Sequence, residues 1–512
     1  MEAGFEFFAQ QGPRATAIID ATGRNWSRIE TARLARQTAR AFLQLGLSPG
    51  DVVAVVARNR SEYLVVYLAT QQAGLSMVPV NWHLAAPELA YILEDSGAKA
   101  IFVDSRLGAL VTDALLLQPS LHPTLVSFGR LPGFTDFDEL IAAQSAAPLE
   151  RGLPGQVLQY TSATTGRPKA VVVPPTSRPS LERRIQLHIS MGVELDDATV
   201  NLCVAPLYHA APLDIAATAL HMGHTVLVLD GFEPEGCLQL MAQHRVGTAF
   251  MVPMMFLRFL KLPKDIRSRY STEHLKWVNH GGAPCPPEVK RQMIEWWGPV
   301  LWDAYGSSEG GGGTICSPQE WLRYPGTVGR PLPGSQCKIL NDAGDELLPS
   351  EVGLIYLTRA AGDRFAYKGD AAKTDASYRG AFFTVGDLGY LNDEGYLFVS
   401  GRNTDMIISG GVKIYPAELE QALAVHPLVA DCAVIGIPDA VLGEAVKVIV
   451  QLMPGHEGAP EMTAALIRFL GSRVAAIKLP RRFEYARELP RDPSGKLYKR
   501  RLGTAPSECA VR

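Results

Sequence analysis

Hydrophobic and polar positions follow two different periods along the first hundred residues. Val52–Ala57 is a continuous apolar run rich in β-branched residues, which is typical of a strand covered on both faces. Ala98–Val103 repeats this signal, and a shorter apolar run lies at Met77–Val80. Ser27–Glu30 has the capping-box sequence Ser-Arg-Ile-Glu, which predicts a helix from there towards Leu45.

Strands and helices alternate through this region, since a second helical pattern ends near Ala73. The alternation predicts an α/β fold with doubly wound, largely parallel sheets. After Gly401 the pattern changes: an apolar strand is expected at Met406–Ile408, and Pro416 opens a helix. Strands near Ala433–Ile437 and Ala445–Leu452 and a helix near Thr463–Arg473 then indicate a small α+β domain.

This change of pattern suggests where the domains divide. We expect a large N-terminal domain at 1–402, a hinge at 403–405 and a small, mobile C-terminal domain at 406–503. The last residues, 504–512, are expected to form a disordered tail.

Composition and charge narrow the class of protein. The 512 residues are 47% hydrophobic and 20% charged, as in ordinary globular proteins. The formal net charge of −3 gives no electrostatic reason to expect nucleic-acid binding. No apolar run approaches the ~20 residues of a membrane-spanning helix. The seven cysteines are scattered and never form C-x-x-C, so neither a disulfide framework nor a zinc site is expected, and a reducing cytoplasm fits.

A polar loop follows the strand-like segment Gln156–Gln159. Tyr160–Lys169 contains closely spaced hydroxyl side chains, a glycine and a lysine. Such groups can bind phosphate oxygens, although the loop does not fit the P-loop pattern. Composition alone favours a polar surface turn. The order of the residues, however, resembles the phosphate loop Y-T-S-G-T-T-G-x-P-K-G of the adenylate-forming superfamily, which includes acyl-CoA synthetases, peptide-synthetase adenylation domains and luciferase. The chain departs from it at Ala163 and Ala170.

Further segments match this superfamily in the same order. They are Pro206–His209, similar to P-L-F-H beside the acyl pocket; Gly281–Pro284, similar to a loop flanking adenine; Asp303–Glu309, similar to Y-G-x-T-E; Val385–Asp387, similar to T-G-D; Gly401–Pro416, similar to the junction between the domains; and Leu489–Lys496, similar to the C-terminal loop P-x-x-x-x-G-K. Singly, each match could be a turn, a buried histidine or an exposed loop residue. Together they indicate membership of the superfamily.

The resemblance implies roles for the matching residues. Tyr305 stacks on adenine, Asp303 lies near its amino group, Asp387 accepts hydrogen bonds from the ribose, and Lys496 bridges the acid and the α-phosphate. The full implied ATP site is Thr161, Ser162, Thr164, Thr165, Gly166, Lys169, Gly282, Ala283, Pro284, Asp303, Tyr305, Gly306, Asp387 and Arg402. Ser308 and Glu309 join Lys496 as the implied catalytic residues, and Glu309 and Thr164 are the implied Mg²⁺ ligands.

Residues for the acid and the thiol are implied in the same way. Tyr208, His209, Gly281, Gly310 and Gly311 would contact the acid, and Gly410, Gly411 and Lys413 would serve the thiol step. Four consecutive glycines from Gly310 leave space for a bulky acid, although a flexible loop explains them equally well. Thr404 occupies the hinge position, where the family has Lys or Asp, so we expect thioester formation to be slow relative to adenylation.

The leading hypothesis is an acyl- or aryl-CoA synthetase that uses ATP, Mg²⁺ and CoA to activate a small-molecule carboxylic acid. One alternative is an enzyme that passes its acyl-AMP to a carrier protein or a partner ligase. Another is a non-catalytic ligand-binding relative. The sequence leaves the acid, the acceptor and the oligomeric state open.

Overall fold

The computed structural model describes residues 4–149, 154–161, 167–174, 180–309, 313–359, 364–491 and 497–502. The chain forms two compact units. The first comprises Met1–Phe250, Asp265–Val278 and Arg364–Asp375, and the second comprises Met251–Lys264, Asn279–Asp363 and Ala376–Arg512. Because both units combine segments from distant parts of the sequence, the domain boundary predicted at 403–405 stays a prediction.

A six-stranded parallel sheet forms the part of the first unit that the hydrophobic pattern predicted. Its order is β7-β6-β5-β3-β4-β8. The strands are β3 (Val52–Val56), β4 (Ser76–Pro79), β5 (Ala98–Asp104), β6 (Thr124–Phe128), β7 (Thr135–Asp136) and β8 (Gln156–Val157). The three strands expected from the apolar runs are therefore confirmed.

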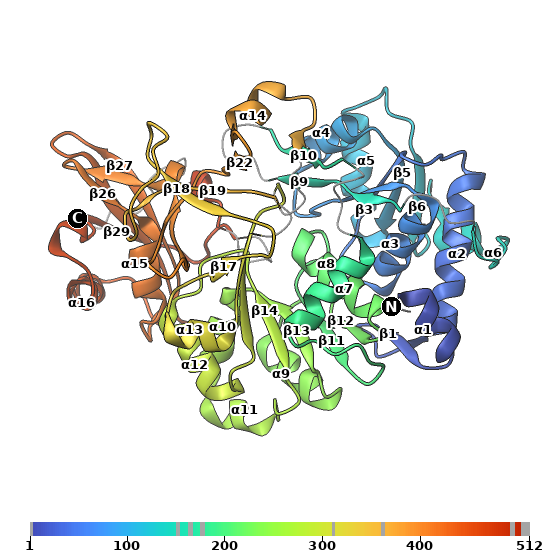
Figure 1. The fold of residues 1–512 in the computed structure, drawn as a ribbon, viewed down its shortest axis with the longest axis horizontal. Helices are drawn as coiled ribbons and strands as arrows, with labels where there is room; N and C mark the ends of the chain where they lie inside the picture. The colour runs from blue at the N-terminus through green and yellow to red at the C-terminus, as the bar shows by residue number, and fades with distance from the viewer. Residues whose placement is uncertain are drawn as a thin grey trace. The chain divides into compact units, whose positions relative to one another are not determined.

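Helices cover both faces of this sheet (Figure 1). Val53 and Val55 of β3 pack in one core with α2 (Arg28–Gln44) and α3 (Ser61–Ala73). Ala54 and Val56 pack in another core with α4 (Ala86–Ser96) and α5 (Gly108–Leu116). Successive strand residues face opposite sides of a sheet, so an unbroken apolar run fills both cores. The doubly wound fold is confirmed.

The start of α2 shows how local sequence fixes an element. Ser27 caps the helix, because its Oγ accepts a hydrogen bond from the Glu30 backbone N–H at 3.2 Å. The helix ends at Gln44, one residue before the predicted Leu45.

One predicted strand is divided between two sheets. The segment Gln156–Gln159 was expected to be continuous, but β8 ends at Val157 and β9 begins at Gln159. The Leu158 N–H still bonds to Met77 at 2.8 Å, whereas Gln159 pairs with Val171 in a different sheet. The change of partner is a tertiary effect that an apolar pattern does not encode.

The first unit contains a second set of mainly parallel strands. β11 pairs with β12 and β13, β12 pairs with β1, and β2 is antiparallel to β1. The remaining elements of this unit are α1 (Phe5–Gln11), β1 (Thr16–Ile19), β2 (Asn25–Ser27), α6 (Phe137–Ala142), α7 (Leu181–Ser190), β11 (Val200–Cys203), α8 (Ala210–His221), β12 (Thr225–Val228), α9 (Pro234–Gln243), β13 (Thr248–Met251), α11 (Lys264–Arg269) and β14 (Trp277–His280), of which β13, α11 and β14 reach the division between the units.

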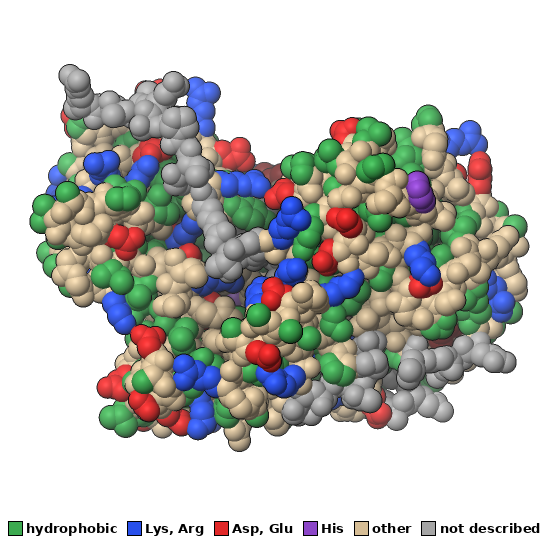
Figure 2. Space-filling model, turned by 90° about the horizontal axis from the view of Figure 1, so that it is seen from above, with side chains coloured by type: hydrophobic (Ala, Val, Ile, Leu, Met, Phe, Trp, Pro, Cys, Tyr) green, Lys and Arg blue, Asp and Glu red, His purple; other side chains and the backbone are tan. Residues whose placement is uncertain are grey.

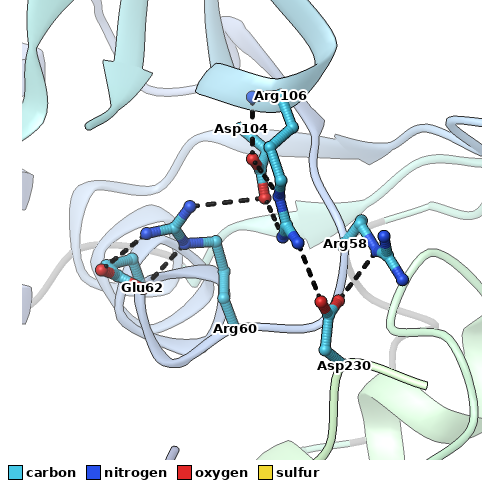
Figure 3. A network of polar contacts seen from close by, with 6 residues as sticks. All are labelled: Arg58, Arg60, Glu62, Asp104, Arg106 and Asp230. Atoms are coloured by element: carbon cyan, nitrogen blue, oxygen red, sulfur yellow. Dashed lines mark hydrogen bonds and ion pairs between the residues drawn. The ribbon is translucent and has the colours of Figure 1, made fainter. Parts of the chain in front are cut away.

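A polar network joins the ends of these two strand sets (Figure 3). Asp104, at the end of β5, is 1% exposed and binds the Arg106 guanidinium at 2.7 and 2.9 Å. Arg60 lies 3.4 Å from the same carboxylate. Asp230, just beyond β12, forms ion pairs with both Arg106 and Arg58 at 2.9 Å. The network therefore ties the carboxyl ends of β3, β5 and β12 together.

Asp104→Asn is expected to lower the free energy of unfolding by about 2–3 kcal/mol, since it weakens charge-assisted hydrogen bonds to a buried carboxylate. Burial alone would raise the pKa of Asp104, but hydrogen bonds from Arg106 and the charge of Arg60 hold it below 3.8. The stabilisation is therefore present at neutral pH and is lost as the pH falls through this lowered pKa.

Urea denaturation of both proteins at pH 7 and near pH 3 measures this effect. Glu139→Gln is the matched control, because the Arg130–Glu139 pair is 4.0 Å apart and largely exposed. A loss for Asp104→Asn no larger than for this control would contradict the role given to the network.

The second unit contains three antiparallel strands, β15 to β17, and two further sheets. One sheet has the order β21-β22-β19-β23-β24, with β18 beside β19. These elements are α10 (Pro253–Leu260), α12 (Pro287–Trp297), β15 (Leu301–Tyr305), β16 (Thr314–Cys316), α13 (Pro318–Arg323), β17 (Arg330–Pro331), β18 (Cys337–Leu340), β19 (Gly353–Leu357), α14 (Ala371–Ala376), which crosses the division between the units, β21 (Tyr378–Arg379), β22 (Phe382–Phe383), β23 (Asp387–Leu391) and β24 (Leu397–Arg402).

The C-terminal part of the second unit is the predicted α+β arrangement. Its sheet has the order β26-β25-β28-β27, with β29 beside β28. Leu419 and Leu423 of one helix and Leu466 and Leu470 of another lie in one hydrophobic core with Val448 of the sheet. The elements are β25 (Ile407–Ser409), β26 (Val412–Ile414), α15 (Pro416–Ala424), β27 (Val429–Asp439), β28 (Gly443–Leu452), α16 (Pro460–Gly471) and β29 (Arg482–Tyr485).

The surface and helix lengths bear on possible partners. Over the face shown in Figure 2, Lys and Arg side chains are interspersed with Asp and Glu. In the described ranges, every helix is too short or too polar to cross a bilayer.

Candidate active site

In the first unit, a hairpin holds the ends of the predicted phosphate loop. β9 (Gln159–Thr161) and β10 (Lys169–Val172) are antiparallel, with Lys169 opposite Thr161, and β20 (Ala366–Tyr367) pairs with β10. The loop therefore starts and ends at neighbouring backbone positions. The predicted residues Ser162, Thr164, Thr165 and Gly166 lie outside the described residues, as does the side chain of Thr161.

Asp95, near the end of α4, anchors this hairpin. Its Oδ2 accepts a hydrogen bond from the Tyr160 hydroxyl at 2.7 Å, and its backbone carbonyl accepts one from Lys368 Nζ. Burial and the neighbouring Asp95 raise the pKa of Tyr160. The phenol therefore stays protonated and donates the hydrogen bond. Asp95 was not among the predicted site residues, because its partner Tyr160 is 65 residues away and no motif marks it.

The residues predicted to contact the acid lie at the start of α8. Tyr208 is buried, and its ring centroid is 4.5 Å from that of His209, the residue preceding the helix. The Gln159 side chain donates to the Tyr208 carbonyl at 2.7 Å, which links this segment to β9. The buried Asn59 accepts from Leu207 N–H at 2.8 Å and donates to the Ala205 carbonyl at 3.0 Å. Asn59 thus fixes the approach to Tyr208, and no sequence motif pointed to it.

In the second unit, three predicted nucleotide-binding residues come together. The Tyr305 hydroxyl donates to Asp387 Oδ2 at 2.8 Å, and Arg402 Nε lies 3.4 Å from Asp387 Oδ1. Asp387 and Arg402 are directly opposite each other on β23 and β24, so their side chains share a face. Burial and the neighbouring carboxylate raise the pKa of Tyr305. The result is a carboxylate held between a phenol and a guanidinium.

Two further predicted segments flank β15 in the sequence. Gly281 directly follows β14 and begins the loop that continues through Ala283 and Pro284, in which Gly282 has a φ of +81°, a conformation that favours glycine. Beyond β15, Gly306 and Ser308 lead to Glu309, which is 8% exposed and whose carbonyl accepts from Arg359 at 2.7 Å. A carboxylate suits Mg²⁺ by donor chemistry. Gly310, Gly311 and the other predicted metal ligand, Thr164, lie outside the described residues.

The predicted hinge and thiol-step residues occupy exposed positions. Thr404 lies in a 3₁₀ turn at Asn403–Asp405, and its Oγ1 bonds to Asp405 at 3.4 Å. Gly410 and Gly411 have φ values of +57° and +81° and connect β25 to β26, on which Lys413 is exposed. Lys496 lies outside the described residues; on either side, Arg491 and Leu497 form an antiparallel bridge.

The family assignment follows from comparison with known proteins. The model of the AMP-binding enzyme family matches residues 5–361, and that of its C-terminal domain matches 418–496. The chain belongs to the AMP-binding enzyme family, whose members are adenylate-forming enzymes. The resemblance proposed from the motifs is thereby confirmed.

Relatives that match along nearly their whole length differ in the acceptor that their names state. A fatty acid–[acyl-carrier-protein] ligase, ScoC, of Streptomyces coeruleorubidus is 30% identical over 97% of this chain and 94% of its own. A feruloyl-CoA synthase of an Amycolatopsis species is 31% identical over 96% of both chains. The solved structure of the amide bond synthetase McbA from Marinactinospora thermotolerans has a TM-score of 0.82 and 25% identity, covering 97% and 98% of the two chains.

Proposed function

We propose that this protein activates a carboxylic acid as its acyl-adenylate at the expense of ATP and then transfers the acyl group to CoA. The observation that carries the proposal is the Tyr305–Asp387–Arg402 cluster, which offers a fixed carboxylate to a ribose in a chain of this family. In the first step a carboxylate oxygen attacks the α-phosphorus, the bond to the bridging oxygen of the β-phosphate breaks, and pyrophosphate leaves. In the second, the thiolate sulfur attacks the acyl carbon and AMP leaves.

The barrier in the first step is repulsion between two anions, the acid and the triphosphate. Mg²⁺, when bound, supplies positive charge to the phosphate oxygens, and Glu309 with Thr164 would hold it. We assign Lys169 and Lys496 to neutralise charge at the phosphates and at the reacting carboxylate. Asp95 would position the loop that bears Lys169 through Tyr160.

For the domains, we propose that residues 1–402 bind ATP and acid and that 406–503 rotate about 403–405 between the two steps. The relatives leave two acceptors besides CoA in view: a carrier protein, as in the name of ScoC, and an amine, as in the name of the amide bond synthetase McbA. We give CoA precedence because, besides the feruloyl-CoA synthase, an indoleacetate–CoA ligase and long-chain-fatty-acid–CoA ligases are 28–30% identical over at least 90% of this chain. A bulky acid remains our proposal for the substrate.

Hydroxylamine trapping tests the first step directly. The protein is incubated with Mg-ATP and a panel of aliphatic, aromatic and polycyclic acids, and the acyl-adenylate is detected as its hydroxamate. Replacing hydroxylamine with CoA, or with a loaded carrier protein, then identifies the acceptor. Acid-dependent hydroxamate supports the proposal, and its absence across the panel favours the non-catalytic alternative.

Tyr305→Phe is expected to raise the KM for ATP about fivefold with little change in kcat. The substitution keeps the ring but removes the 2.8 Å hydrogen bond that orients Asp387, and a single such bond contributes about 1 kcal/mol. Steady-state kinetics at varied ATP measure this. Tyr390→Phe is the control, since the Tyr390 ring stacks on Phe398 with centroids 4.8 Å apart. An unchanged KM would contradict the orienting role.

A further inference from the structure

A fully buried lysine lies beneath the predicted adenine-facing residue. Lys290, on α12, has a side chain that is 0% exposed, and its Nζ is 3.5 Å from Asp303 Oδ2 on β15. The ammonium also lies 5.1 Å from the centroid of the Trp321 ring. No sequence motif pointed to Lys290, and none of the roles assigned above uses it.

The charges around Asp303 are simple to assign. Within the described residues, the other ionisable group in ion-pair range is His280, whose Nε2 is 3.5 Å from the same Oδ2. Burial lowers the pKa of His280 to about 3 although the Asp303 carboxylate acts to raise it, so the imidazole is neutral at neutral pH. Lys290 is then the one positive charge opposing this carboxylate in the described structure. A buried ammonium without an anion nearby is strongly destabilising, so each of the two charges stabilises the other.

The strand geometry relates Asp303 to the proposed ribose site. Asp303 and Tyr305 are two residues apart on β15, so their side chains lie on one face of the strand, about 7 Å apart. Tyr305 contacts Asp387, and Asp303 is the neighbouring residue on the same face of β15. The Asp303 side chain is 11% exposed, and within the described residues Lys290 and His280 both approach Oδ2 rather than Oδ1.

We propose that Lys290 is a positioning residue that holds Asp303 as a charged, acceptor-only group and thereby makes the nucleotide site selective for a purine with an amino group at position 6. This inference rests on the proposed function and adds a specificity determinant to it. A carboxylate accepts hydrogen bonds but donates none. It can pair with a 6-amino group, whereas a 6-oxo group would place two acceptors against each other and leave both unpaired.

The test compares ATP with inosine triphosphate, which carries an oxo group at position 6, in pyrophosphate exchange by the full-length protein. Lys290→Met keeps the length of the side chain without its charge. We expect its kcat/KM with ATP to fall about tenfold or more, and its preference for ATP over inosine triphosphate to narrow by a similar factor. Lys338→Met is the control, because Lys338 pairs with Glu346 on the surface of the same unit, and it should change neither value.

A double variant keeps the test informative if Lys290→Met folds poorly. Lys290→Met combined with Asp303→Asn has no buried charge to balance, and the amide oxygen can still accept from a 6-amino group. We expect it to use ATP better than either single variant does, yet to show a narrowed preference, because the amide NH₂ can donate to a 6-oxo group.

Each outcome distinguishes this inference from the proposed function. If the wild-type protein exchanges pyrophosphate with neither nucleotide, the proposed function fails. If the wild type is active but Lys290→Met or the double variant keeps the full preference for ATP, the role of Lys290 is wrong. A merely structural role would lower thermal stability and leave the ratio between the two nucleotides unchanged.

Discussion

Lys496→Ala is expected to slow acyl-adenylate formation about 10²–10³-fold and to leave thioester formation from supplied acyl-AMP nearly unchanged. The lysine is assigned to the step in which two anions must approach, and removing a charge aimed at that step commonly costs this much. In the second step the triphosphate is gone, and the thiolate attacks the uncharged acyl carbonyl of the mixed anhydride. A residue that serves one step alone should lower the rate of that step alone.

The two half-reactions are measured separately: hydroxamate formation for the first, and CoA-dependent release of AMP from synthetic acyl-AMP for the second. Lys499→Ala is the matched control. Lys499 lies three positions farther along, and its ammonium pairs with Glu420 at 2.7 Å, so its removal should spare both rates. An equal loss in both half-reactions for Lys496→Ala would contradict the assignment.

Asp387→Ala is expected to lower kcat/KM for ATP about 10- to 100-fold, and to impair the reaction of supplied acyl-AMP as well. Hydrogen bonds to a charged acceptor contribute about 1.5–3 kcal/mol, and both ATP and acyl-AMP carry the ribose. The substitution also frees Tyr305 and Arg402, which the carboxylate now holds at 2.8 and 3.4 Å. The effect should therefore extend across both steps, unlike that of Lys496→Ala.

Kinetics of both half-reactions, together with a thermal denaturation curve, show whether Asp387→Ala weakens nucleotide binding or folding. Asp393→Ala is the control, since Asp393 is exposed in the turn between β23 and β24. Asp387→Asn, which keeps one carbonyl acceptor, should fall between the wild type and Asp387→Ala. A well-folded Asp387→Ala protein with wild-type KM values would show that the carboxylate does not bind the ribose.

The parts of the fold that depend on local sequence were predictable. The Ser27 cap, the β3 run and the helix opened by Pro416 depend on side chains within a few residues, and the structure has all three. The division at Leu158 was not predictable, because it depends on which sheet offers a partner to Gln159.

The candidate site shows the same limit. Motif order located Tyr305, Asp387 and Arg402, and the structure joins them by hydrogen-bond and ion-pair contacts. Sequence motifs did not identify the residues that support the site. Asp95 acts through Tyr160 and Lys368, which are 65 and 273 residues away. Lys290 has the charge of a surface residue but lies in the core opposite Asp303. Such pairs arise from tertiary contacts and leave no local pattern.

Exchange of labelled pyrophosphate into ATP is the sharpest test of acid adenylation, because it detects reversible formation of an acyl-adenylate whatever the final acceptor is. We expect Mg²⁺-dependent exchange that appears only when a suitable acid is added, proceeds without CoA, and falls about 10²–10³-fold in Lys496→Ala. Pyrophosphate exchange that does not depend on any acid would contradict acid adenylation as the function of this protein. So would the absence of exchange with every acid of a broad panel when the protein binds ATP.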